Sequence, residues 1–156
     1  MDDPGEYLRS VVRVFPDYAD TVIWFAPGPV RYEDAHVSTE LRDAMIAWEQ
    51  AWYDDLSEDF QFSSPAAARS LAVEGHRLAT LLSAELGENF EVEVLLDSVG
   101  RQNERLRGTG PGTNIEAVAA FRGMAAKHKA DSDRIRALIA DGAQFIWTAR
   151  SKSDSP

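Results

Sequence analysis

The sequence contains no cysteine and only three histidines. The lack of thiols excludes disulfide bonds, thiolate metal sites and cysteine nucleophiles, and it is typical of a reducing compartment. No apolar run approaches the roughly 18 residues that a membrane-spanning helix needs. The first ten residues, MDDPGEYLRS, are acidic and polar, unlike a secretory signal. We therefore expect a cytoplasmic protein with no membrane partner.

Positive charge is also scarce, since 16 Lys and Arg residues stand against 26 Asp and Glu and give a net charge of −10. The excess is concentrated in residues 33–60, which hold nine acidic residues and one base, Arg42. Residues 101–136 have the opposite bias, with eight bases and four acids. Nucleic acid would repel so acidic a chain, so we expect no nucleic-acid partner. An acidic segment is commonly a solvated surface, but it also suits a basic protein partner.

The length and the 44% hydrophobic and 27% charged composition fit one α/β domain over residues 1–150, with a disordered tail over residues 151–156. Apolar periodicity and capping residues predict a first helix from Pro4 to Phe15, and further helices after Ser38, Ser64 and Thr113. The last helix should run to about residue 140, with a break near Ala130. Strands are predicted at 21–26, 90–96 and 143–149.

This order, α-β-α-α-β-α-β, places helical crossovers between strands, and such crossovers favour parallel pairing. We therefore expect a small, mostly parallel three-stranded sheet covered by helices, with residues 21–26 inside it. The spacing of Leu41, Met45, Trp48 and Trp52 predicts one buried stripe. Trp24 and Phe145 are also expected in the core.

Acidic residues follow that stripe closely in LRDAMIAWEQAWYDDLSEDF, residues 41–60. Like charges four residues apart destabilise a helix, as does negative charge at its C-terminal end, so the helix should end near Asp54 or Asp55. The exposed segment beyond it is either a solvated face or a docking surface for a basic partner. We call the candidate partner-binding set the acidic arc, and it comprises Glu49, Tyr53, Asp54, Asp55, Glu58, Asp59 and Phe60.

The glycine-rich stretch GTGPGTN, residues 108–114, is an alternative site. A glycine-rich loop before a helix presents backbone N–H groups that attract anions. The candidate anion-binding residues are Arg101, Arg105, Arg107, Gly108, Gly110, Gly112 and Thr113. The stretch lacks the lysine of a phosphate-binding P-loop and does not directly follow a predicted strand. It fits either an anion site of a small enzyme or a mobile connector within residues 97–112.

The sequence shows no convincing catalytic set. It contains no G-x-S-x-G motif, and Glu33, His36 and Glu40 lack the second histidine that such zinc sites normally use. His76 and His128 fit boundary, core or helix-surface positions. Glu91 and Glu93 share one strand face, which suits acid–base chemistry or simple exposure. We therefore predict no metal and no cofactor, and a non-enzymatic function is favoured.

Residues 24–52 resemble a pattern found in small bacterial proteins. It consists of Trp24, the turn Pro27-Gly28-Pro29, the segment Ser38-Thr39-Glu40-Leu41, and Trp48 and Trp52 one helical turn apart. Some proteins of this kind are held to be immunity proteins for toxins. The resemblance implies an acidic inhibitor that binds a toxin and performs no chemistry. Together with the charge pattern, it predicts a protein-interaction module docking on a basic partner, and the sequence specifies no oligomeric state.

Overall fold

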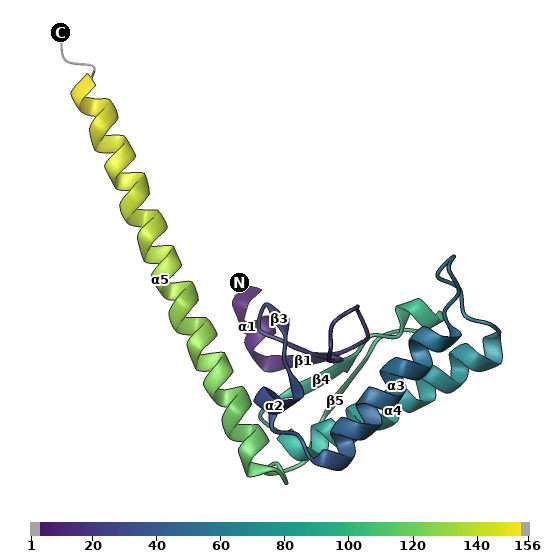
Figure 1. Ribbon diagram of the computed structural model, residues 1–156. Coiled ribbons are helices and arrows are strands. Elements are labelled where there is room, and N and C mark those ends of the chain that lie inside the picture. Colours follow the sequence, from purple (N-terminus) through teal and green to yellow (C-terminus); the bar gives the residue numbers. More distant parts are fainter. Residues whose placement is uncertain (1–3, 154–156) are drawn as a thin grey trace.

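The computed structural model describes the backbone of residues 4–153 and the side chains of residues 5–142. Its elements, in chain order, are α1 (Pro4–Ser10), β1 (Val11–Val14), β2 (Ile23–Phe25), β3 (Gly28–Pro29), α2 (Tyr32–Ala35), α3 (Thr39–Asp55), α4 (Pro65–Leu86), β4 (Glu91–Val94), the 3-10 turn η1 (Asp97–Val99), β5 (Glu104–Arg107) and α5 (Ile115–Ser153). Figure 1 shows the sheet lying over α3 and α4, with α5 leading away from the domain.

The sheet has five strands in the order β3-β2-β1-β4-β5. Only β1 and β4 pair in parallel, and the other three pairings are antiparallel. The α/β class is confirmed, but the prediction of a three-stranded, mostly parallel sheet is wrong. The sequence predicts a helix for the residues of β1 and a loop for those of β5, whereas both are strands. Valines at 11, 12 and 14 satisfy helical spacing as well as a strand, so periodicity alone could not separate the two.

The helix pair α3 and α4 covers one face of the sheet, and the two helices lie side by side (Figure 1). The predicted caps are present, since the hydroxyls of Ser38 and Ser64 accept hydrogen bonds from the backbone N–H groups of Leu41 and Ala67. The stripe Leu41, Met45, Trp48 and Trp52 is buried, as predicted. The helix α3 also ends at Asp55, where the acidic run predicted its end.

Alternation along the strands separates an apolar face from a polar one. Val12, Val14, Val92 and Val94 are fully buried beneath the helices. Residues of the opposite face form a charged row across three strands, because Arg13 lies beside Glu93 in the register and Glu93 beside Arg105. Glu91 and Glu93 share this polar face, as predicted, but Glu93 is only 12% exposed because its carboxylate accepts from the Tyr7 hydroxyl of α1 and pairs with Arg105.

Trp24 lies on this second face and is half-buried, which corrects its expected place in the core. Its neighbours Ile23 and Phe25 point into the core instead, because side chains alternate along a strand. The indole of Trp24 stacks on Phe15 at a centroid distance of 4.9 Å, and its Nε1 donates a 3.0 Å hydrogen bond to the Phe15 carbonyl. Phe15 follows β1 and belongs to no helix, since α1 ends at Ser10.

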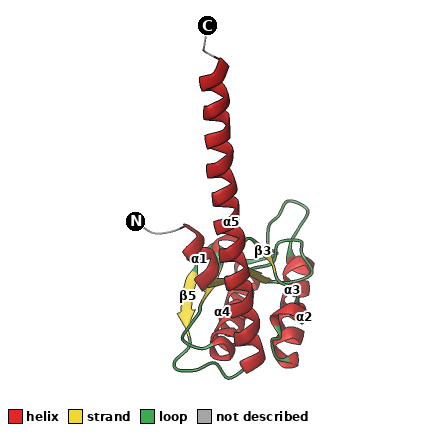
Figure 2. Cartoon of the chain, turned by 90° about the vertical axis from the view of Figure 1, so that its left-hand side faces the viewer, coloured by secondary structure: helices red, strands yellow, loops and turns green. Residues whose placement is uncertain are grey.

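The final helix is longer than predicted. It begins after Asn114, whose side-chain oxygen accepts from the Ala117 N–H, so Asn114 rather than Thr113 is its cap. Helix α5 continues through Ala130 without a break and on to Ser153, so the predicted strand at 143–149 is wrong. The C-terminal part of α5 extends away from the sheet (Figures 1 and 2). A helix satisfies its own backbone hydrogen bonds without a neighbouring strand.

Among the described side chains of α5, the buried Ala117 and Phe121 belong to the core. The side chain of Phe145, expected in the core, lies outside the described residues, as do residues 154–156 of the predicted tail.

Candidate functional site

The structure divides the acidic arc into three groups. Asp54, Glu58, Asp59 and Phe60 are exposed at the end of α3 and in the loop that follows. Tyr53 and Asp55 are half-buried and make structural contacts. Glu49 is turned toward the protein, and its Oε2 is buried without a hydrogen-bond partner in the described part of the chain. The predicted residues therefore share one end of the domain, but only four of them are fully available to a partner.

The loop between α3 and α4 has a defined conformation. The Ser57 hydroxyl accepts hydrogen bonds from the backbone N–H groups of Asp59 and Gln61, and the Ser57 N–H donates to the Gln61 carbonyl at 2.8 Å. The Asp55 carboxylate closes the base of the loop by accepting from both the hydroxyl and the N–H of Ser63. The loop therefore holds Phe60 in a fixed position, 71% exposed.

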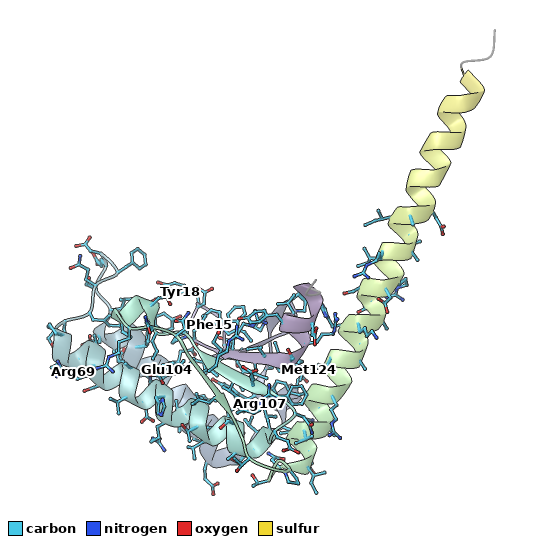
Figure 3. The ribbon with its side chains drawn as sticks, turned by 180° about the vertical axis from the view of Figure 1, so that it is seen from behind. Phe15, Tyr18, Arg69, Glu104, Arg107 and Met124 are labelled. Carbon is cyan, nitrogen blue, oxygen red and sulfur yellow. The ribbon has the colours of Figure 1, made fainter. Side chains whose placement is uncertain are left out.

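A second exposed aromatic residue, which the sequence did not single out, lies beside this loop. Tyr18 is 73% exposed, and its backbone N–H donates a 2.6 Å hydrogen bond to the Tyr53 hydroxyl. Figure 3 shows Tyr18 and Phe15 at the end of the sheet that is remote from α5. Tyr18 and Phe60 both have positive φ angles, 51° and 60°, which are unusual for aromatic residues. The signal in the sequence was weak: an aromatic residue between Asp17 and Asp20.

Both aromatic residues line one small cavity of about 180 Å³. Its remaining walls are Pro16, Asp17, Trp52, Tyr53, Leu56, Phe62 and Ser98. Most of these side chains are aromatic or aliphatic, but Asp17 and Ser98 make part of the wall polar. The exposed residues Asp54, Glu58 and Asp59 lie close by in the sequence. We call Tyr18, Tyr53 and Phe60, together with these four acids, the aromatic–acidic surface.

The pKa values of two carboxyl groups in the acidic arc are shifted in opposite directions. Burial raises the pKa of Glu49, and the nearby negative charge of Asp20 adds to this effect. Hydrogen bonds from Ser63 lower the pKa of Asp55. Asp55 therefore serves to hold the loop, whereas Glu49 carries a charge that the fold does not favour.

Two of the three arginines of the alternative anion site are already engaged. Arg105 Nε donates to Glu93 and Arg107 Nη2 to Glu91, each at 2.7 Å, while Arg101 is exposed in the turn before β5. Glu91 and Glu93, considered above as an acid–base pair, thus neutralise these two guanidinium groups. Figure 3 labels Glu104 and Arg107, the end residues of β5, within the stretch that we had expected to be a mobile loop.

The glycines of this stretch have a packing role. A Cβ atom at Gly108 would lie 2.3 Å from the Ser83 carbonyl oxygen, and one at Gly112 would lie 2.4 Å from that of Glu85. Gly110 has a φ of 74°. Thr113 donates its hydroxyl to the Ala84 carbonyl. Residues 108–113 therefore fit closely against the C-terminal end of α4.

The histidines lie apart from one another. His76 is hydrogen-bonded to Glu104 across α4 and β5, and His36 has a left-handed conformation at the end of α2. His128 is half-buried on α5, and its Nδ1 has no partner among the described residues. Across that same part of the chain, no group of three His, Asp or Glu side chains is placed to hold a metal ion.

A hollow of about 740 Å³ lies where α3, α4 and α5 meet. Its polar wall is a network in which the Glu85 carboxylate accepts from the N–H and the hydroxyl of Ser38 and from the side-chain amide of Asn114. Leu81 and Ile115 form part of its apolar wall. The polar groups of Ser38, Glu85 and Asn114 are therefore hydrogen-bonded to one another. This network fixes the start of α3 against the start of α5.

The structure is that of a small mixed α/β protein that exposes the aromatic–acidic surface at one end. A model of the family described as Serratia CdiI immunity protein-like matches residues 10–97. The chain belongs to this family, which confirms the resemblance seen between Trp24 and Trp52 and extends it in both directions. Membership indicates a role in protein interaction. Neither the curated proteins nor the solved structures contained a match.

The matched segment contains every residue of the acidic arc and Tyr18, whereas β5 and α5 lie beyond it. Within the described residues, no helix has the length and apolar character to cross a membrane.

Proposed function

We propose that this protein is an immunity-type inhibitor that binds a basic toxin through the aromatic–acidic surface. The observation that carries the proposal is the pair of exposed aromatic residues, Tyr18 and Phe60, on the rim of one cavity. The family match supports the inhibitor role, because the surface lies wholly within the matched residues.

The backbone conformations of Tyr18 and Phe60 support a role in binding. A left-handed conformation costs a residue other than glycine about 1–2 kcal/mol. Exposure of the rings adds no compensating burial within the chain. Such strain is commonly found at sites of function, where a residue is held in the conformation that its partner requires. Large aromatic side chains are also the usual anchors of protein interfaces.

The acids would act mainly on the rate of association. Carboxylates around an apolar centre attract a basic partner over distances of about a Debye length, roughly 8 Å at physiological salt. This attraction speeds encounter more than it strengthens the final complex. In this account the aromatic rings set the dissociation rate and the acids set the association rate.

The test uses the protein encoded by the gene adjacent to that of this chain, and measures association and dissociation by surface plasmon resonance. The variant Asp54→Lys/Asp59→Lys changes two exposed acids and leaves Asp55 to hold the loop. We expect association to slow by about tenfold or more at low salt, with the difference shrinking as salt rises. Tyr18→Ala/Phe60→Ala should instead speed dissociation, by on the order of 100-fold.

The matched control is Glu33→Lys/Glu88→Lys, which makes the same change in net charge at exposed positions outside the surface. If this control slows association as much as Asp54→Lys/Asp59→Lys does, the effect belongs to net charge and the proposed location is wrong. Tight binding that survives Tyr18→Ala/Phe60→Ala would also contradict the proposal.

A further inference from the structure

A groove runs between α3 and α4 on the solvent side of this helix pair, which lies side by side in Figure 1. It contains two hollows in line. One is the hollow of about 740 Å³ at the start of α5, and the other, of about 420 Å³, lies toward the end of α3. Ala44 and Arg77 line both hollows, so the groove is continuous.

The lining of the groove is mostly apolar. Helix α3 contributes Ala44, Ala47 and Ala51, whose small side chains leave room for an occupant. Leu81 of α4 is 40% exposed, and Ile115, the first residue of α5, is 81% exposed. A partner that covers these side chains gains the free energy of burying apolar surface, about 25 cal/mol per Å².

The groove carries uncompensated negative charge. Glu40, Glu85 and Glu116 line the larger hollow, and the carboxylate of Glu85 accepts from neutral groups of Ser38 and Asn114. In the described part of the chain, none of the three glutamates takes part in an ion pair. Arg77 brings positive charge, but Glu74 already binds its guanidinium at 2.6 and 2.9 Å. The groove therefore favours a basic occupant.

The walls of the groove also select the secondary structure of the occupant. Both long walls are helices, whose backbone groups are bonded within each helix, so they offer no strand edge for pairing. A segment that satisfies its own backbone hydrogen bonds is a helix. At 1.5 Å per residue, the lining from Leu41 to Ala51 spans about 15 Å of α3 and that from Ser70 to Glu85 about 22 Å of α4, which suits a helix of about three to four turns.

One end of the groove adjoins the aromatic–acidic surface. Asp54 of that surface follows Ala51 by three residues and therefore lies on the same side of α3. We propose that the toxin places a basic amphipathic helix in this groove, with its apolar side on Leu81 and the alanines and its bases beside Glu40 and Glu116. This inference rests on the proposed function, because it assigns a second contact to the same partner.

A substitution that fills the groove tests the contact. Ala47 is exposed, and arginine is nearly as good a helix former as alanine, so Ala47→Arg should keep the fold. We expect it to weaken toxin binding by about tenfold or more in plasmon resonance, because the side chain blocks the groove and repels a basic helix. The matched control is Gln50→Arg, which makes the same charge change on α3 at an exposed position that lines neither hollow. It should bind within about twofold of wild type, and circular dichroism verifies the helix content of both variants.

Removing the negative charge tests the chemistry of the occupant. Glu40→Gln/Glu116→Gln should weaken toxin binding by about three- to tenfold. Glu33→Gln/Glu88→Gln removes the same charge from exposed positions outside the groove and should change binding by less than about twofold. Equal losses in the two pairs would show that net charge alone is responsible and would contradict the inference.

Crosslinking tests the helical form of the occupant. Photoreactive p-benzoylphenylalanine, placed at Ala47 or at Ala51 in separate variants, should crosslink to toxin residues three or four positions apart within one basic segment. Crosslinks to residues two apart would indicate an extended segment and overturn the inference.

Comparison with Tyr18→Ala/Phe60→Ala separates this inference from the proposed function. If Ala47→Arg binds the toxin like wild type while Tyr18→Ala/Phe60→Ala loses affinity, the groove is not a contact and the proposed function stands. If Ala47→Arg loses affinity while Tyr18→Ala/Phe60→Ala retains it, the groove is the toxin site and the aromatic–acidic surface is not. Self-association of the chain without toxin, abolished by Ala47→Arg in sedimentation equilibrium, would make a second copy the occupant and overturn the inference.

Discussion

The backbone N–H of Tyr18 donates a 2.6 Å hydrogen bond to the hydroxyl of Tyr53, and the centroids of their rings lie 5.0 Å apart. This contact joins the loop before β2 to the last turn of α3, across 35 positions of sequence. It fixes the loop that presents Tyr18 on the element that also leads to Phe60. The two exposed aromatic residues are thus held in one rigid arrangement.

Replacing Tyr53 by phenylalanine should loosen this arrangement. The variant keeps the ring contact but removes the acceptor for the Tyr18 N–H, so we expect a loss of about 0.5–1.5 kcal/mol of unfolding free energy. Urea denaturation measures this change. Proteolysis should at the same time become faster within residues 15–20. Unchanged stability together with unchanged proteolysis would show that the hydrogen bond does not hold the loop.

Replacing Phe60 by glycine should have opposite effects on stability and binding. Glycine accepts the positive φ of this position without strain, so the chain should become more stable by up to about 1–2 kcal/mol. Loss of the ring should weaken toxin binding by tenfold or more. Thermal unfolding and plasmon resonance on the same sample measure the two effects. A variant that loses stability and retains affinity would refute the assigned role of Phe60.

Two glycines of the helices provide a matched test of the packing of the core. A Cβ atom at Gly75 would lie 2.8 Å from Cζ2 of the buried Trp48, whereas one at Gly123 would meet nothing within 4 Å. We expect Gly75→Ala to cost about 1–3 kcal/mol by overpacking. Gly123→Ala should instead stabilise α5 by up to about 1 kcal/mol. Chemical denaturation of both variants measures these changes, and equal effects would contradict the close contact of α4 with Trp48.

The carboxyl group of Glu49 should make stability depend on pH. Its pKa in the folded chain is raised above the ordinary value of 4.5, so the folded state disfavours the charged form. Below 4.5 the group is protonated in both states and costs nothing. As pH rises through 4.5 and then through the folded pKa, the chain loses stability. Glu49→Gln should therefore melt a few degrees higher than wild type at pH 7, with the difference vanishing near pH 3.5. A difference independent of pH would exclude this origin.

The sequence predicts secondary structure correctly where its local signals all indicate the same element. Ser38, the four-residue stripe that follows it and the acidic run ending at Asp55 define α3 correctly, because cap, period and stop agree. The prediction of a helix at Val11–Val14 was wrong because the valines of this segment fit a helix and a strand equally well. The strand Glu104–Arg107 was not predicted because its side chains are mostly polar, which is typical of a loop. In the fold, Glu93 and Glu91 of the neighbouring strand neutralise the charges of Arg105 and Arg107.

The candidate site was predicted in part for a similar reason. Charge density in the sequence located the end of the domain that carries the acidic arc. It could not locate Tyr18, because that residue joins the surface only through the fold, by its contact with Tyr53. Nor could it separate Asp54, which is exposed, from its neighbour Asp55, which is bound by Ser63.

The most direct test of the account is amide hydrogen exchange of the chain with and without the protein encoded by the adjacent gene. Exchange reports protection segment by segment and therefore locates the contact independently of any substitution. The account predicts that binding slows exchange in residues 16–20 and 56–62, with no change in α5 beyond residue 126. Protection confined to residues 101–114, or to the hollow around Ser38 and Asn114, would contradict it.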